Sequence, residues 1–152
     1  EYYNIIEAKA AVAETCARIG AILGGGNSRE IDALANYGKT LGILMTIRDD
    51  FIDLFEPDEL RNRARNEILP LPILQAFLNP RQKNKIVRLV KKDGITERET
   101  REISDLIMEM TEVQNLKNEM KSLIKKAENL LKYLKGNRNA LKLLLRCTLE
   151  DL

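Results

Sequence analysis

A helical segment that is apolar along most of its length but ends in acids constrains the fold of this chain most strongly. Residues 38–53 read GKTLGILMTIRDDFID. At roughly 100° per residue, Asp49 and Asp53 lie on one face of such a helix, together with Gly42 and Gly38. The pattern therefore predicts a helix whose last turns direct two carboxylates the same way.

On the N-terminal side of the acids, this face carries small or semi-polar side chains. A packing face would normally carry Leu or Ile at these positions. We interpret the face as a cavity wall lined by Gly38, Gly42, Met45 and Thr46. A DDxxD sequence alone is more often a solvated helix end, because surface helices are rich in acids. Here Ile47, Phe51, Ile52 and Leu54 make the surrounding turns apolar. We therefore favour a helix that is buried on its other sides.

The acidic end suits magnesium chemistry. Carboxylate oxygens are hard ligands, and Mg²⁺ prefers one or two of them with water and phosphate oxygens to an all-protein cage. The sequence contains no histidine, which removes the usual general base and the Ser-His and Cys-His nucleophile pairs. Any catalysis must therefore use carboxylates, lysines, metal or substrate electrostatics, and we predict no individual catalytic side chain.

The acidic segment resembles the second aspartate-rich motif of the trans-prenyltransferases, or polyprenyl diphosphate synthases, which reads roughly GxxFQxxDDxxD. Four residues match this motif in register, namely Gly42, Asp49, Asp50 and Asp53. Residues 1–25 are similar to the family's helix with a Lys-Thr diphosphate contact, which reads Lys9-Ala10 here. The segment LPLPILQAF at 69–77 is similar to the one that follows the motif loop. The resemblance is specific over residues 1–80.

The chain also departs from the family pattern. The Phe-Gln that precedes the acids is Met45-Thr46, and the Thr after Lys9 is Ala10. The loop after the motif reads ELRNRARNEILPLP and lacks the recognisable Gly-Lys and later Lys of the family. The family's first aspartate-rich motif belongs to its N-terminal half and is absent from this sequence. The chain begins with Glu rather than Met in a helical pattern, so we expect a truncated or cleaved product.

The resemblance implies an all-α fold, a helical bundle of the isoprenoid synthase type that is incomplete. Residues 1–152 would be the C-terminal part of one such domain. The implied activity is prenyl transfer, the condensation of an allylic diphosphate with isopentenyl diphosphate, a homoallylic diphosphate. We expect no turnover from the isolated chain, because it supplies only one aspartate-rich wall.

The resemblance also implies the site residues. Mg²⁺ would be held by Asp49, Asp50 and Asp53. The substrate diphosphate would be bound by Lys9 and by the loop residues Arg61, Arg63 and Arg65. We expect a homodimer, or association with the missing N-terminal half.

Readings of a different class remain open. The chain could be a naturally short, non-catalytic subunit that regulates a larger prenyl synthase, or a helical interaction module. The intact acids Asp49, Asp50 and Asp53 argue against decay of the site, whereas the altered Met45-Thr46 pair argues for it.

Periodicity and breakers predict helices throughout, with no strand pattern. A Gly-rich turn at 24–26 separates the first two helices, Asn27 with Glu30 forms a capping box, and Thr96 with Glu99 forms another. Pro57 is predicted to end the second helix, before a charged loop to Leu69. The predicted helical ranges are 2–23, 27–55, 70–79, 97–110, 112–134 and 138–150.

Composition restricts the remaining possibilities. The net charge of +2 over 152 residues favours neither acidic nor basic partners, and no apolar run reaches membrane length. Residues 81–92, RQKNKIVRLVKK, are basic but lack interleaved aromatics, so we predict a solvated face and no nucleic-acid partner. Cys16 and Cys147 lie far apart and are predicted to be buried, reduced thiols, which suits a cytoplasmic compartment.

Overall fold

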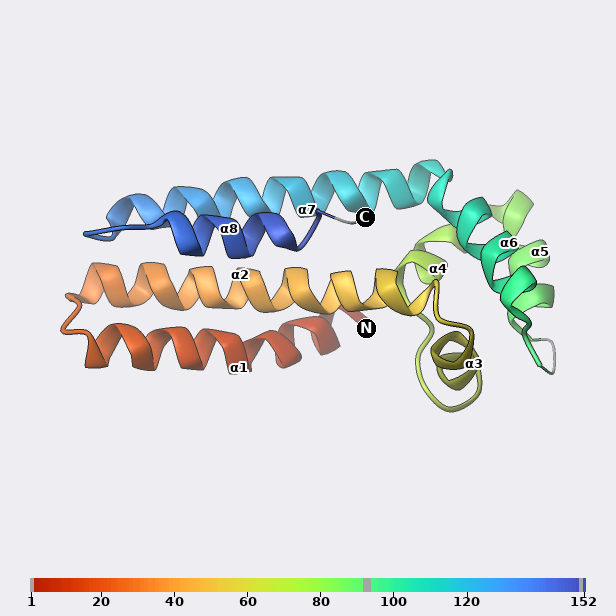
Figure 1. Cartoon of the computed structure of the whole chain (residues 1–152), viewed down its shortest axis with the longest axis horizontal. Coiled ribbons are helices and arrows are strands. Elements are labelled where there is room, and N and C mark those ends of the chain that lie inside the picture. The colour runs from red at the N-terminus through yellow and green to blue at the C-terminus, as the bar shows by residue number, and fades with distance from the viewer. Residues whose placement is uncertain (1, 92–93, 151) are drawn as a thin grey trace. The chain divides into compact units, whose positions relative to one another are not determined.

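A computed structural model describes residues 2–91, 94–150 and 152 of the chain. These described residues form eight α-helices and one 3₁₀-helix and contain no strand, which confirms the all-α class (Figure 1). The elements are α1 (Tyr2–Leu23), α2 (Ser28–Asp53), α3 (Pro57–Asn66), α4 (Leu71–Ala76), α5 (Pro80–Val90), α6 (Glu97–Met108), α7 (Thr111–Leu130), η1 (Leu131–Tyr133) and α8 (Asn139–Cys147).

The chain divides into two compact units. The first unit contains residues 1–48 and 120–152, and the second contains residues 49–119. Helices α2 and α7 each contribute to both units. Whether residues 1–152 belong to one larger isoprenoid synthase domain stays a prediction.

In the first unit, a glycine turn connects α1 to α2, as predicted. Gly25 has a positive φ of 72°, a conformation that glycine adopts without steric cost. Asn27 caps α2, because its Oδ1 accepts hydrogen bonds from the backbone N–H groups of Arg29 and Glu30 at 3.0 and 3.1 Å. The Glu30 carboxylate accepts from the Asn27 backbone N–H at 3.0 Å, so the predicted capping box is confirmed.

Helices α1 and α2 pack closely through small residues. A Cβ added to Gly38 would lie 2.5 Å from the backbone oxygen of Ala13, and one added to Gly42 would lie 2.9 Å from the Cα of Ala10. Both distances are shorter than a real Cβ contact allows, so these two glycines permit the close approach of the helices.

Helix α8 is joined to α2 by a buried tyrosine. The Tyr37 hydroxyl donates a hydrogen bond of 2.9 Å to the Leu141 carbonyl, and burial raises the pKa of Tyr37 to about 12. The core of the first unit is formed by residues such as Ile6, Ala10, Leu44, Ile47, Met120, Ala127, Leu131 and Leu145.

In the second unit, the predicted charged loop is wrong in part, because residues 57–66 form helix α3. Pro57 stands in its first turn, where a missing backbone N–H costs nothing and the fixed φ suits a helix. The acids of α3 lie in its first turn and two of its arginines in its last turn, an arrangement that the helix dipole favours. Helices α3 to α6 contact one another around a core that includes Phe51, Leu60, Ile73, Ile86, Ile103 and Ile107.

Helix α5 carries most of the basic segment. Its apolar residues Ile86 and Val90 are buried, whereas its basic residues Arg81, Lys83, Lys85 and Arg88 are exposed. The prediction of a solvated basic face is confirmed for these residues, while Lys92 lies outside the described residues. At the start of α6, Thr96 and Glu99 form the predicted capping box.

The C-terminal helices begin and end close to their predicted positions, and the cysteines differ from prediction in one respect. Neither Cys16 nor Cys147 forms a disulfide in the described part of the chain, and both are exposed rather than buried as predicted. Within the described ranges, none of the helices has the length and hydropathy needed to cross a membrane.

Candidate functional site

The three acids of the DDxxD sequence lie in the second unit at the end of α2 and have different environments. Asp49 is exposed, Asp53 is half-buried, and Asp50 is only 2% exposed. The difference follows from the helix period, because Asp50 falls on the same stripe as the buried Phe51 and Leu54. The acids therefore cannot all play the same role.

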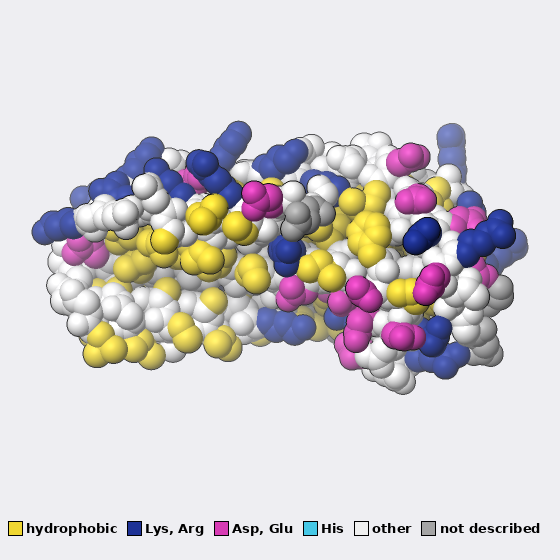
Figure 2. Space-filling view, viewed as in Figure 1, with side chains coloured by type: hydrophobic (Ala, Val, Ile, Leu, Met, Phe, Trp, Pro, Cys, Tyr) yellow, Lys and Arg dark blue, Asp and Glu magenta, His cyan; other side chains and the backbone are white. Residues whose placement is uncertain are grey.

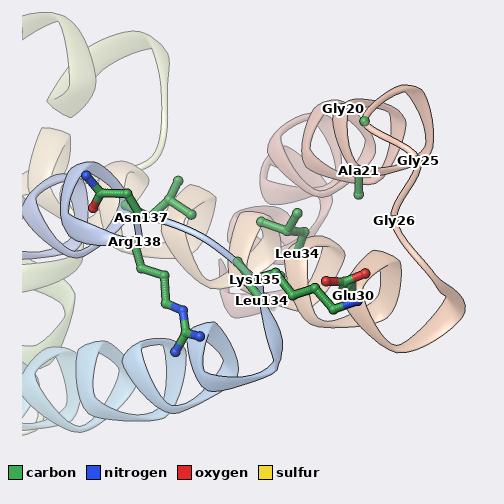
Figure 3. A pocket seen from close by; sticks show the side chains of 12 residues that line it. Gly20, Ala21, Gly25, Gly26, Glu30, Leu34, Leu134, Lys135, Asn137 and Arg138 are labelled. Atoms are coloured by element: carbon green, nitrogen blue, oxygen red, sulfur yellow. The ribbon is translucent and has the colours of Figure 1, made fainter.

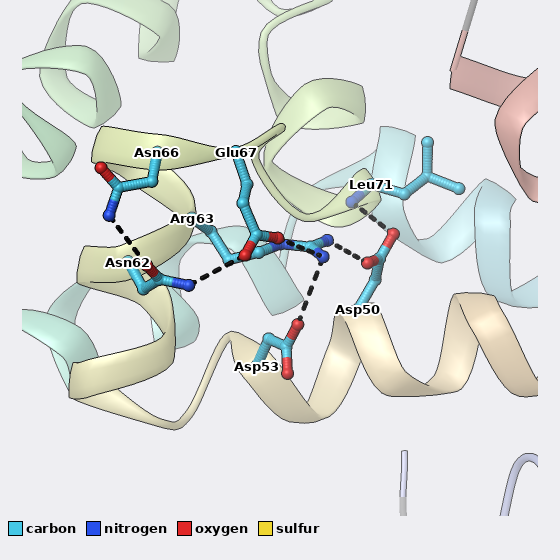
Figure 4. Close-up of polar contacts among 7 residues, drawn as sticks. All are labelled: Asp50, Asp53, Asn62, Arg63, Asn66, Glu67 and Leu71. Atoms are coloured by element: carbon cyan, nitrogen blue, oxygen red, sulfur yellow. Dashed lines mark hydrogen bonds and ion pairs between the residues drawn. The ribbon is translucent and has the colours of Figure 1, made fainter.

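Asp50 is a structural anchor for two other segments. One of its oxygens, Oδ1, accepts a hydrogen bond from Nη2 of Arg63 on α3, and its Oδ2 accepts one of 3.0 Å from the backbone N–H of Leu71 on α4 (Figure 4). A buried carboxylate is expensive unless it is paired and hydrogen-bonded, and here both oxygens are engaged. Asp50 would have to exchange these contacts to bind a metal ion, and its predicted metal contact stays a prediction.

Arg63 connects several acids rather than presenting a free cationic surface. Its side chain is 12% exposed, and its Nη1 lies 3.7 Å from an oxygen of Asp53 and 3.7 Å from one of Glu67 (Figure 4). Together with its contact to Asp50, these ion pairs place the guanidinium among three carboxylates. The predicted diphosphate contact of Arg63 is thus occupied by the chain's own acids in this structure.

The environment of Asp53 disfavours the ionised form of its carboxyl group, so its pKa is raised. Burial raises the pKa of the Asp53 carboxyl above its usual value, the nearby Arg63 lowers it, and the negative charges of Asp50, Glu59 and Asp49 raise it again. The net direction is upward, so one guanidinium does not offset both burial and the neighbouring carboxylates.

The other loop arginines have separate positions on α3. Arg61 donates from Nη1 to Asp58 at 3.0 Å and from Nη2 to the Ile95 carbonyl at 2.8 Å, which ties α3 to the segment before α6. Arg65 is exposed. A diphosphate contact of either residue stays a prediction.

Lys9 lies in the first unit on α1 and is exposed. Helix periodicity predicts that Lys9 shares a face with Ile5, Ile6, Ala13, Cys16 and Gly20, and of these Ile6 is buried whereas Cys16 and Gly20 are exposed. The buried stripe of α1 contains Ile6 and Ala10, so Lys9 needs no anion to be tolerated where it is. Its diphosphate contact stays a prediction.

The residues predicted to line a cavity also belong to the first unit. Gly38 and Gly42 pack against α1, which explains their small size without a cavity. Thr46 donates its hydroxyl hydrogen bond to the Gly42 carbonyl at 2.9 Å, and Met45 is 43% exposed. A cavity-lining role for Met45 and Thr46 is compatible with these positions and stays a prediction.

The carboxylates of Asp49 and Asp53 at the end of α2 fit one open magnesium site. No group of three or more Asp, Glu or Cys side chains in the described part of the chain is arranged to hold a metal ion. Mg²⁺, however, is commonly bound by only one or two carboxylates together with water and substrate phosphates. Asp49 and Asp53 lie one helical turn apart outside the buried stripe, so they fit this requirement, whereas Asp50 does not.

Sequence reasoning missed the partners of Asp50, although one signal was present. The apolar residues Ile47, Phe51 and Leu54 define the buried stripe, and Asp50 is inside it. A charged residue on a buried stripe requires a counter-charge. The sequence could therefore have indicated that Asp50 is paired, but not that its partners would be Arg63 and Leu71.

Comparison with known proteins identifies the family of this chain. The family described as polyprenyl synthetase matches residues 1–107, and this chain belongs to it. The chain is 36% identical over 70 residues to a geranylgeranyl diphosphate synthase of Methanosarcina mazei, a match that covers 45% of this chain and 22% of that protein.

Two further relatives show the same extent of similarity. A short chain isoprenyl diphosphate synthase of Methanothermobacter thermautotrophicus is 40% identical over 60 residues, covering 39% of this chain and 18% of the relative. Geranylgeranyl pyrophosphate synthase 12, chloroplastic, of Arabidopsis thaliana is 41% identical over 61 residues, covering 40% of this chain and 17% of the relative. The matches thus span about a fifth of each of these relatives. No solved structure is significantly similar to this chain.

Proposed function

We propose that this chain supplies the second aspartate-rich wall of a prenyl diphosphate synthase, an enzyme that condenses an allylic diphosphate with isopentenyl diphosphate. Family membership and the names of the relatives support this class of reaction. The observation that carries the proposal is the separation of roles at the end of α2. Asp50 anchors the structure from the buried side, whereas Asp49 is exposed and Asp53 is half-buried at 3.7 Å from Nη1 of Arg63.

Asp49 and Asp53 would hold Mg²⁺ in this function. When bound, the ion supplies Lewis-acid stabilisation of the charge on a departing diphosphate. Asp50 and Arg63 would act as positioning residues, because their contact fixes the end of α2 relative to α3 within the second unit. A site held in advance avoids reorganisation when charge develops.

The cationic contacts would come from exposed side chains. Lys9 in the first unit and Arg65 in the second are each exposed to solvent. Arg61 and Arg63 would have to exchange contacts with Asp58 and Asp50, respectively, to do so. Lys9 and Arg65 are therefore the stronger candidates of the four.

Association with further polypeptide is part of the proposal. Helix α1 exposes the apolar side chains Val12, Ile19, Ile22 and Leu23, and Figure 2 shows hydrophobic side chains along the edge that α1 forms. Exposed apolar surface of this kind marks an interaction site. We propose that it meets either a second copy of the chain or the N-terminal half of a synthase. We further propose a reducing compartment such as the cytoplasm, since neither Cys16 nor Cys147 is in a disulfide in the described part of the chain.

The test combines metal binding with turnover. We expect the chain to bind Mn²⁺, used as a paramagnetic substitute for Mg²⁺, and to gain prenyl transfer when an N-terminal half of a relative is added. Asp49→Ala and Asp53→Ala should each lower turnover by about 10²-fold or more, whereas the exposed control Glu119→Ala should not. Full turnover in both aspartate variants would refute the metal assignment.

A non-catalytic regulatory subunit is the second candidate, and one observation favours it. Arg63 already pairs with two of the three acids of the motif, as a structural site without metal would require. In that case the chain should change the turnover of a separate intact synthase, and Asp49→Ala should not alter this effect. Loss of the effect in Asp49→Ala would instead support the enzyme.

A further inference from the structure

A small hollow in the first unit is lined almost entirely by polar and basic residues. It has a volume of about 150 Å³ and lies between the end of α7, η1 and the start of α8. Its lining residues are Glu128, Asn129, Leu131, Lys132, Arg138 and Lys142, and we call it the basic hollow. None of these residues belongs to the aspartate-rich segment, which lies in the second unit.

The one acid of the basic hollow is already neutralised from outside it. Both Nε and Nη2 of Arg146 lie 3.1 Å from Oε1 of Glu128. Among the described residues, no ion pair involves Lys132, Arg138 or Lys142. Three cationic side chains therefore converge on the basic hollow without a carboxylate to balance them.

Arg138 adds a second, independent observation. Its Nε is buried and has no hydrogen-bond partner among the described residues. Arg138 also lines a larger cavity of about 450 Å³ beside the glycine turn at 24–26. Figure 3 shows, however, that its guanidinium is directed away from that turn and toward the ribbon of α7. A buried atom of this kind is not reached from the basic hollow, so the donors that an anion there would meet are the terminal Nη groups of the Arg138 guanidinium.

The size of the basic hollow indicates which anion it can accept. A water molecule takes about 30 Å³ in the liquid, so a space of about 150 Å³ holds about five waters. A phosphate group has a similar number of heavy atoms, so the basic hollow has room for one phosphoryl group, and the second phosphoryl group of a diphosphate would lie outside it. Arginine and lysine together are the usual recognition groups for such an oxyanion, since guanidinium donates in a fixed fork and ammonium acts as a point charge.

We infer that the basic hollow binds a phosphate-type oxyanion through Lys132, Arg138 and Lys142. The ligand is either free phosphate or diphosphate, or the phosphoryl head group of a lipid. This site is separate from the proposed magnesium site, and its occupancy requires no divalent metal. The inference therefore does not depend on the proposed function.

Calorimetric titration of the chain with inorganic diphosphate, in buffer containing a chelator and no Mg²⁺, tests the free-anion source. We expect saturable binding of one diphosphate per chain, weakened at least about tenfold in Arg138→Met. Lys132→Met and Lys142→Met should weaken it by smaller factors. The matched control is Lys121→Met, which removes an exposed lysine of α7 outside the basic hollow and should leave affinity unchanged.

Sedimentation with vesicles tests the lipid source. Vesicles of phosphatidylcholine are compared with vesicles of phosphatidylcholine and phosphatidylglycerol, again without Mg²⁺. Binding only to the anionic vesicles, lost in Arg138→Met and kept in Lys121→Met, assigns the site to a lipid head group.

Thermal unfolding followed by circular dichroism shows whether Arg138→Met remains folded. If it does not, the double variant Lys132→Met and Lys142→Met replaces it in both assays. The inference is overturned if neither diphosphate nor anionic vesicles bind. It is also overturned if the variants of the basic hollow lose no more affinity than Lys121→Met.

Discussion

Replacing Asp50 by alanine should destabilise the chain far more than replacing its neighbour Asp49. Asp50→Ala removes the acceptor for Arg63 and the acceptor for the Leu71 backbone N–H. Hydrogen bonds to a charged group contribute about 1.5–3 kcal/mol each, and breaking a buried ion pair by removing one partner costs about 3–5 kcal/mol. Two such hydrogen bonds give about 3–6 kcal/mol and the ion pair about 3–5 kcal/mol, so we expect the free energy of unfolding to fall by about 3–5 kcal/mol.

Urea unfolding followed by far-ultraviolet circular dichroism measures this loss. With a slope of about 2 kcal/mol per molar urea, the midpoint should fall by about 2 M in Asp50→Ala. Asp49→Ala removes an exposed side chain and should change stability by less than about 0.5 kcal/mol. Asp50→Asn keeps an acceptor for Leu71 but loses the charge that pairs with Arg63, so its loss should be intermediate.

Equal losses in Asp50→Ala and Asp49→Ala would refute the argument, because they would show that burial does not separate the two acids. A normal stability of Asp50→Ala would have the same consequence. A large loss that is also seen in Asp50→Asn would assign most of the effect to the charge on Arg63 rather than to the hydrogen bond from Leu71.

Three further outcomes are expected. Gly38→Ala should destabilise by about 1–3 kcal/mol in urea unfolding, because its Cβ would overlap α1, whereas Gly20→Ala has no neighbour within 4 Å and should stabilise by up to about 1 kcal/mol. Because the pKa of Asp53 is raised from 3.8, the folded chain binds more protons than the unfolded chain just above pH 3.8, so this carboxyl contributes stability that increases as pH falls through that window. When the free energies of unfolding are measured against pH, wild type should therefore become more stable relative to Asp53→Asn as pH falls. A relative stability of wild type that falls with pH would contradict the environment described for Asp53. Tyr37→Phe removes the hydrogen bond to Leu141 and should lower stability by about 1 kcal/mol, a loss that an unchanged melting temperature would exclude.

Local sequence signals predicted the ends of helices well where a residue type has a single structural role, as in glycine turns and capping boxes. The glycine turn at 24–26 ends α1 as predicted, and the capping boxes at Asn27 and Thr96 begin α2 and α6. Such signals depend on hydrogen bonds between residues three or four apart, so no distant part of the chain is needed to interpret them. Proline is more ambiguous, because it can end one helix or begin the next, and Pro57 begins α3.

Helix periodicity had a different limit. It shows which residues share a face, but several stripes of α1 contain small or apolar residues, and only packing decides which stripe is buried. Periodicity therefore groups Lys9 with Ile5, Ile6, Ala13, Cys16 and Gly20, but within this group Ile6 is buried whereas Lys9, Cys16 and Gly20 are exposed. The same limit applies to Gly38 and Gly42, whose small size suits a cavity wall and a close helix contact equally well.

By itself, the sequence determined that the chain is all-α, that it resembles the prenyltransferases, and that an acidic cluster ends its second helix. Only the tertiary structure distinguished the acids from one another. Arg63 and Leu71 follow Asp50 by 13 and 21 residues, and no local pattern specifies a contact across that interval. The folding of α3 and α4 against the end of α2 buries Asp50 and leaves Asp49 exposed, because a helix that packs on one side presents adjacent residues to different surroundings.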